Sequence, residues 1–172
     1  LIRRKYVAKL MRDHAAASYL EAINQQPDFA EVHFNLGLLE QDQRNDPAAV
    51  IHYENALRIR PHYPEALLNL GLSQTNLGEL KEATSSFQKA LALRPDCIEA
   101  CLNLGDVLQR AGAFAESESC FRRALALQPS NLAARLNLSV VLNSMGQVDE
   151  AEKEARSAVL LAPESHRAHA YL

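Results

Sequence analysis

Apolar and polar positions along the chain follow one pattern, which is clearest between residues 67 and 95. An apolar stretch, LLNLGLSQTNL, ends at Gly78, and a second stretch then runs to Pro95. Glycine readily adopts the left-handed conformation that ends a helix, and proline lacks the N–H that a helix interior needs. The pattern therefore predicts one helix, a tight turn and a second helix closed by a proline.

The same pattern recurs with a period of 34 residues and without insertions. A fixed period of this length indicates a repeat architecture, in which each helix pair buries its apolar face against its neighbours. Small residues give room where two helices cross closely, and large aromatic residues fill the space between one pair and the next. The recurring residues are the prolines Pro27, Pro61, Pro95, Pro129 and Pro163, the alanines Ala22, Ala56, Ala90, Ala124 and Ala158, the aromatics Tyr19, Tyr53, Phe87 and Phe121, and an Asn-Leu-Gly run that begins at Asn35, Asn69 and Asn103.

These residues resemble the tetratricopeptide repeat (TPR) family. That family carries an aromatic slot, Leu-Gly, Ala, an aromatic residue, Ala and Pro over one 34-residue period, and the resemblance covers the whole chain. It implies an all-α fold, a right-handed TPR superhelix (an α-solenoid) of antiparallel helix hairpins. It also implies a protein-binding role without naming the partner.

The period divides the chain as a single TPR array over residues 1–172. A partial repeat at 1–29 precedes four full repeats, and a partial helix at 166–172 follows them. The full repeats are expected at 30–63, 64–97, 98–131 and 132–165. Because the chain begins and ends inside a repeat, both ends are expected to be truncated.

Helices are expected at 30–43, 64–77, 81–94, 98–111, 115–128, 132–145 and 149–162. The first full repeat differs because its turn has no Gly. There we expect Pro47 in the first turn of the next helix, where its ring is tolerated, with Asp46 as the cap.

Polar residues before the first helices are expected to cap them. Asp28 with Glu31, and Asp96 with Glu99, have the spacing of a capping box. Ser130 is expected to cap the helix that follows it. The repeat after Ser130 departs most from the pattern, because Arg135 stands in a packing slot and Ala155 replaces the aromatic residue. We therefore expect looser packing beyond this repeat.

An asparagine occurs at the same position of four successive first helices. Its amide can donate to a backbone carbonyl and accept from a backbone N–H at once, so a row of asparagines suits an extended peptide of any sequence. Residues four apart lie on one helix face, which places apolar side chains beside the asparagines. In the family the first helices line a concave face, so the resemblance implies a peptide-binding groove. Its expected residues are Asn35, Asn69, Asn103, Asn137, Phe34, Leu38, Leu68, Leu72, Leu102, Asp106, Leu136 and Val140.

The row also resembles the asparagine ladder in the superhelix of O-linked N-acetylglucosamine transferase, which holds the backbone of a substrate protein. An alternative is that the asparagines bond a neighbouring helix or water. The dicarboxylate clamp of other family members needs Lys and Arg beside the asparagines. It is not expected here, because those positions are mostly Leu or Glu, as at Glu65 and Leu68.

Composition narrows the classes of function. The formal net charge of −3 and the pI of about 6.1 argue against nucleic acid as a partner, since phosphate binding needs a clustered basic surface. No apolar run approaches the roughly 18 residues that cross a bilayer, so no membrane span is expected. The three cysteines form no CxxC pair, and no metal site or cofactor is expected. Their odd number favours a reducing compartment, which we take as cytoplasmic.

No phosphate-binding loop or nucleophile-base arrangement is present, so the chain is not expected to be an enzyme by itself. The function that the sequence favours is a scaffold that binds an extended peptide segment of a partner protein. One alternative is the substrate-recognition arm of a larger enzyme, such as a glycosyltransferase. Another is a self-assembly scaffold, a homo-oligomer formed by end-to-end stacking of exposed helical ends.

Overall fold

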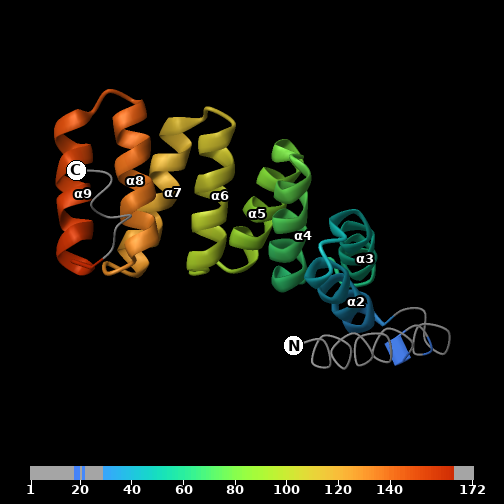
Figure 1. The fold of residues 1–172 in the computed structure, drawn as a ribbon. Coiled ribbons are helices and arrows are strands. Elements are labelled where there is room, and N and C mark those ends of the chain that lie inside the picture. Colours follow the sequence, from blue (N-terminus) through green and yellow to red (C-terminus); the bar gives the residue numbers. More distant parts are fainter. Residues whose placement is uncertain (1–17, 20, 22–28, 165–172) are drawn as a thin grey trace, which may run out of the picture. The chain divides into compact units, whose positions relative to one another are not determined.

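The computed structural model describes residues 18, 19, 21 and 29–164. This part of the chain contains eight long helices and no strand (Figure 1). The bounds of the helices are α2 Ala30–Asp42, α3 Asp46–Ile59, α4 Pro64–Leu77, α5 Leu80–Leu93, α6 Ile98–Arg110, α7 Phe114–Leu127, α8 Leu132–Ser144 and α9 Val148–Leu161. The predicted all-α class is therefore confirmed, and each predicted helix is found within one residue of its expected ends.

The chain divides into two compact units, Leu1–Glu79 and Leu80–Leu172. In the first unit α2 packs against α3, and α3 packs against α4. The core of this unit contains Tyr53, which is fully buried between Ala49 and Leu70. The boundary between the units falls inside the repeat expected at 64–97, after α4 and before α5.

In the second unit each helix from α5 to α9 packs against the next one in the chain (Figure 1). Phe121 of α7 is fully buried, and it lies in one cluster with Leu138, Val141 and Leu142 of α8. The ring of Phe121 thus fills the space between its own hairpin and the next, as the repeat pattern predicts.

The three turn glycines have the expected left-handed backbone. Their φ angles are 81° at Gly78, 79° at Gly112 and 76° at Gly146. Arg44 stands one period before Gly78 and has a φ of 62°, so a residue with a side chain adopts the same conformation there. The turn geometry of the repeat is therefore kept where the glycine is missing.

The predicted caps are wrong in detail. The residue before α6 is Cys97 rather than Asp96, and no side chain caps this helix. Asn131, not Ser130, caps α8, because its Oδ1 accepts from the backbone N–H of Ala134 at 2.9 Å. The proposed capping box of Asp28 and the stretch 166–172 lie outside the described residues.

Asp46 is the first residue of α3 and does not cap it. Its buried carboxylate instead accepts a hydrogen bond from the Asn76 amide of α4, at 3.1 Å. Pro47 lies in the first turn of α3, as expected.

The last described hairpin, α8 with α9, is well packed internally. Ala155 is fully buried where the earlier repeats have an aromatic residue. Arg135 does not fill its slot as an apolar side chain would, because its guanidinium pairs with the carboxylate of Glu154 on α9 at 2.6 Å. The looser packing expected beyond this repeat concerns the stretch that the structure does not describe.

Candidate peptide-binding surface

Four asparagines define the candidate surface of each unit, Asn35 of α2 and Asn69 of α4 in the first and Asn103 of α6 and Asn137 of α8 in the second. Each stands just before a leucine that is buried in its unit, for example Leu36 after Asn35 and Leu104 after Asn103. All four asparagines are half-buried. The helix therefore holds each asparagine beside the core and leaves part of its side chain at the surface.

The amide groups differ in how they are engaged. The Asn69 amide donates to the Glu65 carbonyl one turn earlier in its own helix, at 2.9 Å. The side chains of Asn35, Asn103 and Asn137 have no hydrogen-bond partner among the described residues. Their amide atoms are not among the fully buried atoms without a partner, so they reach solvent. Three of the four amides can thus bond a ligand without breaking a contact within the described chain.

Most of the apolar residues expected beside the asparagines are at least partly accessible. Leu38 is 38% exposed, and Leu68, Leu72, Leu102 and Val140 are half-buried. These side chains could contact apolar groups of a ligand.

Leu136 is an exception to the prediction. Only 2% of it is exposed, because it packs with Ala158 of α9 and with Leu132 and Val159. Leu136 is therefore a core residue of the last hairpin and is not available to line a binding surface.

Phe34 belongs to an aromatic group that the repeat pattern did not indicate. Its ring lies 5.0 Å from that of Tyr63 and 5.9 Å from that of Tyr53, measured between centroids. The guanidinium of Arg60 stands 4.8 Å above the Tyr63 ring. Tyr63 precedes α4 and has no aromatic counterpart one or two periods later, where Cys97 and Asn131 stand, so the repeat gave no signal for this contact.

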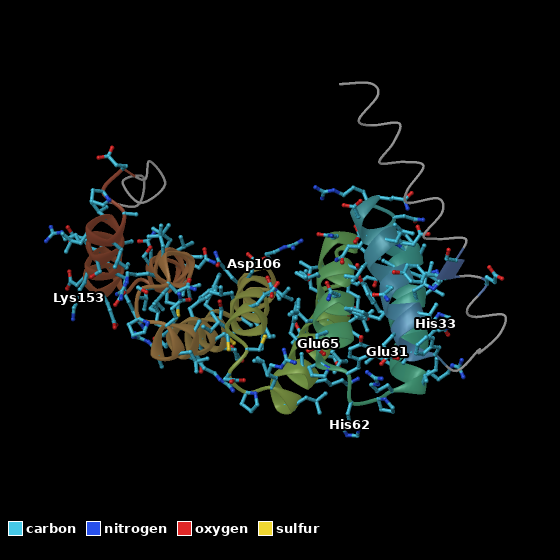
Figure 2. The ribbon with its side chains drawn as sticks, turned by 90° about the horizontal axis from the view of Figure 1, so that it is seen from below. Glu31, His33, His62, Glu65, Asp106 and Lys153 are labelled. Carbon is cyan, nitrogen blue, oxygen red and sulfur yellow. The ribbon has the colours of Figure 1, made fainter. Side chains whose placement is uncertain are left out.

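The charged groups near the asparagines are mainly acidic. Asp106 of α6 is exposed (Figure 2). Glu31 of α2 forms an ion pair with Arg60, and its pKa is lowered, first by the hydrogen bond from its own backbone N–H and then by Arg60. The first helices of the repeats thus present amides, apolar groups and carboxylates to a ligand.

The cysteines show no chemistry that would make a catalytic centre. All three are free thiols, and Cys101 is fully buried, as expected for a small packing residue. Burial raises the pKa of Cys101, and burial together with Cys101 raises the pKa of Cys120 to about 11. No group of three or more His, Cys, Asp or Glu among the described residues could hold a metal ion.

Family models confirm the class of protein that the fold defines. Tetratricopeptide repeat models match residues 12–64, 64–97 and 102–166. The chain therefore belongs to the tetratricopeptide repeat family, whose helical repeats form scaffolds for protein–protein interaction. A comparison with curated protein sequences gives no match.

Solved structures of other TPR proteins share the fold. A crystal structure of MamA is 21% identical, with a TM-score of 0.87, and the match covers 93% of this chain and 94% of that one. YrrB, described as a TPR protein with an unusual peptide-binding site, is 22% identical, with a TM-score of 0.86 and coverage of 97% and 87%. A MamA fragment from Desulfovibrio magneticus RS-1 is 24% identical, with a TM-score of 0.78 and coverage of 81% and 79%. The resemblance of the asparagines to those of the transferase is not confirmed by these comparisons. Among the described helices, none has the length and apolar character of a membrane span.

Proposed function

We propose that this chain binds an extended peptide segment of a partner protein along the first helices of its repeats within one unit, α6 and α8 in the second unit or α2 and α4 in the first. The observation that carries the proposal is the set of solvent-reaching amides that have no partner among the described residues, Asn35 in the first unit and Asn103 and Asn137 in the second. Such an amide can exchange its water for a peptide group without losing an internal hydrogen bond. The general role of a scaffold for protein–protein interaction follows from membership of the family.

The chemistry of the amide favours main chain as the ligand. One Asn side chain offers two donors and an acceptor, which complement the C=O and N–H of a peptide unit. A half-buried leucine next to an asparagine, such as Leu102 before Asn103, suits an apolar side chain of the same segment. Leu136 is left out of the proposed surface because it is buried.

The charges favour a partner segment that is neutral or basic. Asp106 is exposed on α6 of the second unit, and Glu31 of the first unit is paired with Arg60. An acidic segment would bring its carboxylates toward these groups without a compensating cation. We further propose that the chain acts by binding rather than by catalysis.

The test is a selection of peptides from a random library displayed on phage, followed by fluorescence anisotropy with the selected peptides. The double variant Asn103→Ala, Asn137→Ala removes both amides of the second unit that have no partner among the described residues. Loss of two hydrogen bonds of about 1 kcal/mol each should weaken binding about thirtyfold.

Asn55→Ala provides the matched control, since Asn55 is a half-buried asparagine on α3, a second helix. The affinity of the Asn55→Ala variant for the selected peptides should equal that of the wild type. Peptides that bind both variants and the wild type equally would contradict the proposal, as would a library that yields no binder.

A further inference from the structure

Two histidines from neighbouring helices of one hairpin meet side by side. His33 lies on α2 and is 8% exposed, and His52 lies on α3 and is half-buried (His33 is labelled in Figure 2). Their Nδ1 atoms are 3.4 Å apart, with ring centroids at 5.7 Å and ring planes inclined by 35°. Both residues belong to the first unit, and the contact depends on the packing of α2 against α3.

The separation of the two nitrogens is that of a long hydrogen bond, and it also matches the spacing of two ligands of one metal ion. Hydrogen bonds between protein donors and acceptors are usually about 2.7–3.2 Å long, so 3.4 Å is a weak contact. Two nitrogen ligands at about 2.0–2.1 Å from a tetrahedral zinc ion stand about 3.4 Å apart. The two Nδ1 atoms therefore already have the spacing of two corners of such a site.

The surroundings of both imidazoles favour the neutral form, which is the form that binds a metal. Burial lowers the pKa of His33, with further lowering by His52 and by Arg58. Burial also lowers the pKa of His52, which Glu40 partly offsets. A neutral imidazole can offer a nitrogen lone pair to a metal ion. Arg58 opposes a bound cation and Glu40 favours it.

The same two positions of the last hairpin also bring side-chain head groups together. Arg135 and Glu154 stand three periods after His33 and His52, and their charged groups are 2.6 Å apart. The hairpin thus brings the side chains at these two positions together in both cases. In the first unit the residues that meet are both histidine, whose imidazole nitrogen is a common ligand of zinc, copper and nickel.

We propose that His33 and His52 form a two-histidine site for a divalent transition-metal ion of the zinc, nickel and copper class. Water would take the remaining coordination positions, since no third His, Cys, Asp or Glu of the described residues joins the pair. The ion would hold α2 against α3 by joining them through the two rings. The sequence alone predicted no metal site, because the two histidines are 19 residues apart and this spacing matches no metal-binding motif.

The test is a calorimetric titration of the whole chain with Ni²⁺ at neutral pH, with a thermal melt at each metal concentration. Binding to the folded state alone should raise the melting temperature as Ni²⁺ is added. His33→Gln and His52→Gln should each weaken the binding event about tenfold or more, because one of only two protein ligands is lost. His62→Gln removes an exposed histidine of the same unit and should bind like the wild type.

Circular dichroism of each variant without metal shows whether it is folded, and His52→Gln carries the test if the more buried His33→Gln is not. Equal Ni²⁺ affinity in the wild type and in folded His52→Gln would overturn the proposal, because the metal would then be held by the thiols or by other histidines. Absence of any Ni²⁺-dependent rise in melting temperature in the wild type would overturn it as well.

Discussion

The ring of Phe121 lies directly against the backbone of Gly105, across the contact between α7 and α6. A Cβ atom added at Gly105 would stand 2.6 Å from the nearest ring carbon, a distance that real Cβ atoms do not show. The ring is fully buried and cannot move aside easily. Gly105→Ala should therefore lower the free energy of unfolding by about 1–3 kcal/mol, measured by denaturant unfolding, although alanine is the better helix former.

The sign of the stability change in Gly105→Ala distinguishes a steric clash from an effect of helix propensity. At an unobstructed helix position, replacing Gly by Ala stabilises by about 1 kcal/mol. An equally or more stable Gly105→Ala variant would mean that Phe121 does not pack as described. Gly37 has the same relationship to Tyr53, with an added Cβ at 2.4 Å from the ring, and should respond in the same way.

Replacing Arg44, whose backbone is in the left-handed conformation, by glycine should stabilise the protein. Its φ of 62° costs a residue with a side chain about 1 kcal/mol, and the equivalent residues Gly78, Gly112 and Gly146 avoid this cost. Arg44→Gly should raise the denaturation midpoint by an amount that corresponds to about 0.5–1 kcal/mol. Arg44→Lys, which keeps a charged side chain, should leave the midpoint unchanged. A loss of stability in Arg44→Gly would show that the arginine side chain contributes more than the backbone costs.

The buried ion pair of Arg135 and Glu154 should show strong coupling. Their side chains are only 19% and 14% exposed, and the arginine also donates to the Pro129 carbonyl at 2.8 Å. Arg135→Leu leaves a largely buried carboxylate unpaired and should cost about 2–3 kcal/mol. Adding Glu154→Ser should restore much of this loss. Two periods earlier in the chain, the same two positions hold Leu67 and Ser86, so the repeat accepts this combination. Strictly additive losses in the double-mutant cycle would refute this account of the pair.

The pair of His33 and His52 should make stability depend on pH in the mildly acidic range. Both pKa values are lowered from 6.5 in the folded chain, so the unfolded chain takes up protons first as the pH falls. The contribution of the neutral pair is present above pH 6.5 and is lost as the pH falls below it. Without added metal, the difference in melting temperature between pH 7.5 and pH 5.5 should be smaller in His52→Gln than in the wild type. The same pH dependence in both proteins would contradict the assignment.

The repeat and the helix ends could be read from the sequence because Gly and Pro mark them physically. Gly78 and Pro95 bracket one helix, and α4 begins and ends where the pattern places it. The caps were harder, because Ser130 and Asn131 are adjacent and both residue types cap well. The backbone decides which of the two residues caps α8, because it places Asn131 where its side chain reaches the Ala134 N–H.

Features that depend on contacts between helices could not be predicted from one repeat at a time. Leu136 occupies the same position as Phe34 and Leu102, yet it alone is buried, because Val159 and Ala158 of α9 pack on it. The contact of His33 with His52 likewise arises only when α2 and α3 come together. The asparagine positions were predictable as a row, but the sequence did not indicate that Asn69 bonds its own helix.

The central claim, that unengaged asparagine amides hold a peptide backbone, is tested most directly by nuclear magnetic resonance of the side-chain NH₂ groups. The protein would be labelled with ¹⁵N and saturated with a selected peptide. The signals of Asn103 and Asn137 in the second unit should shift on binding, while that of Asn55 on α3 stays in place. A peptide that binds without moving the side-chain NH₂ signal of any of Asn35, Asn103 and Asn137 would contradict the claim.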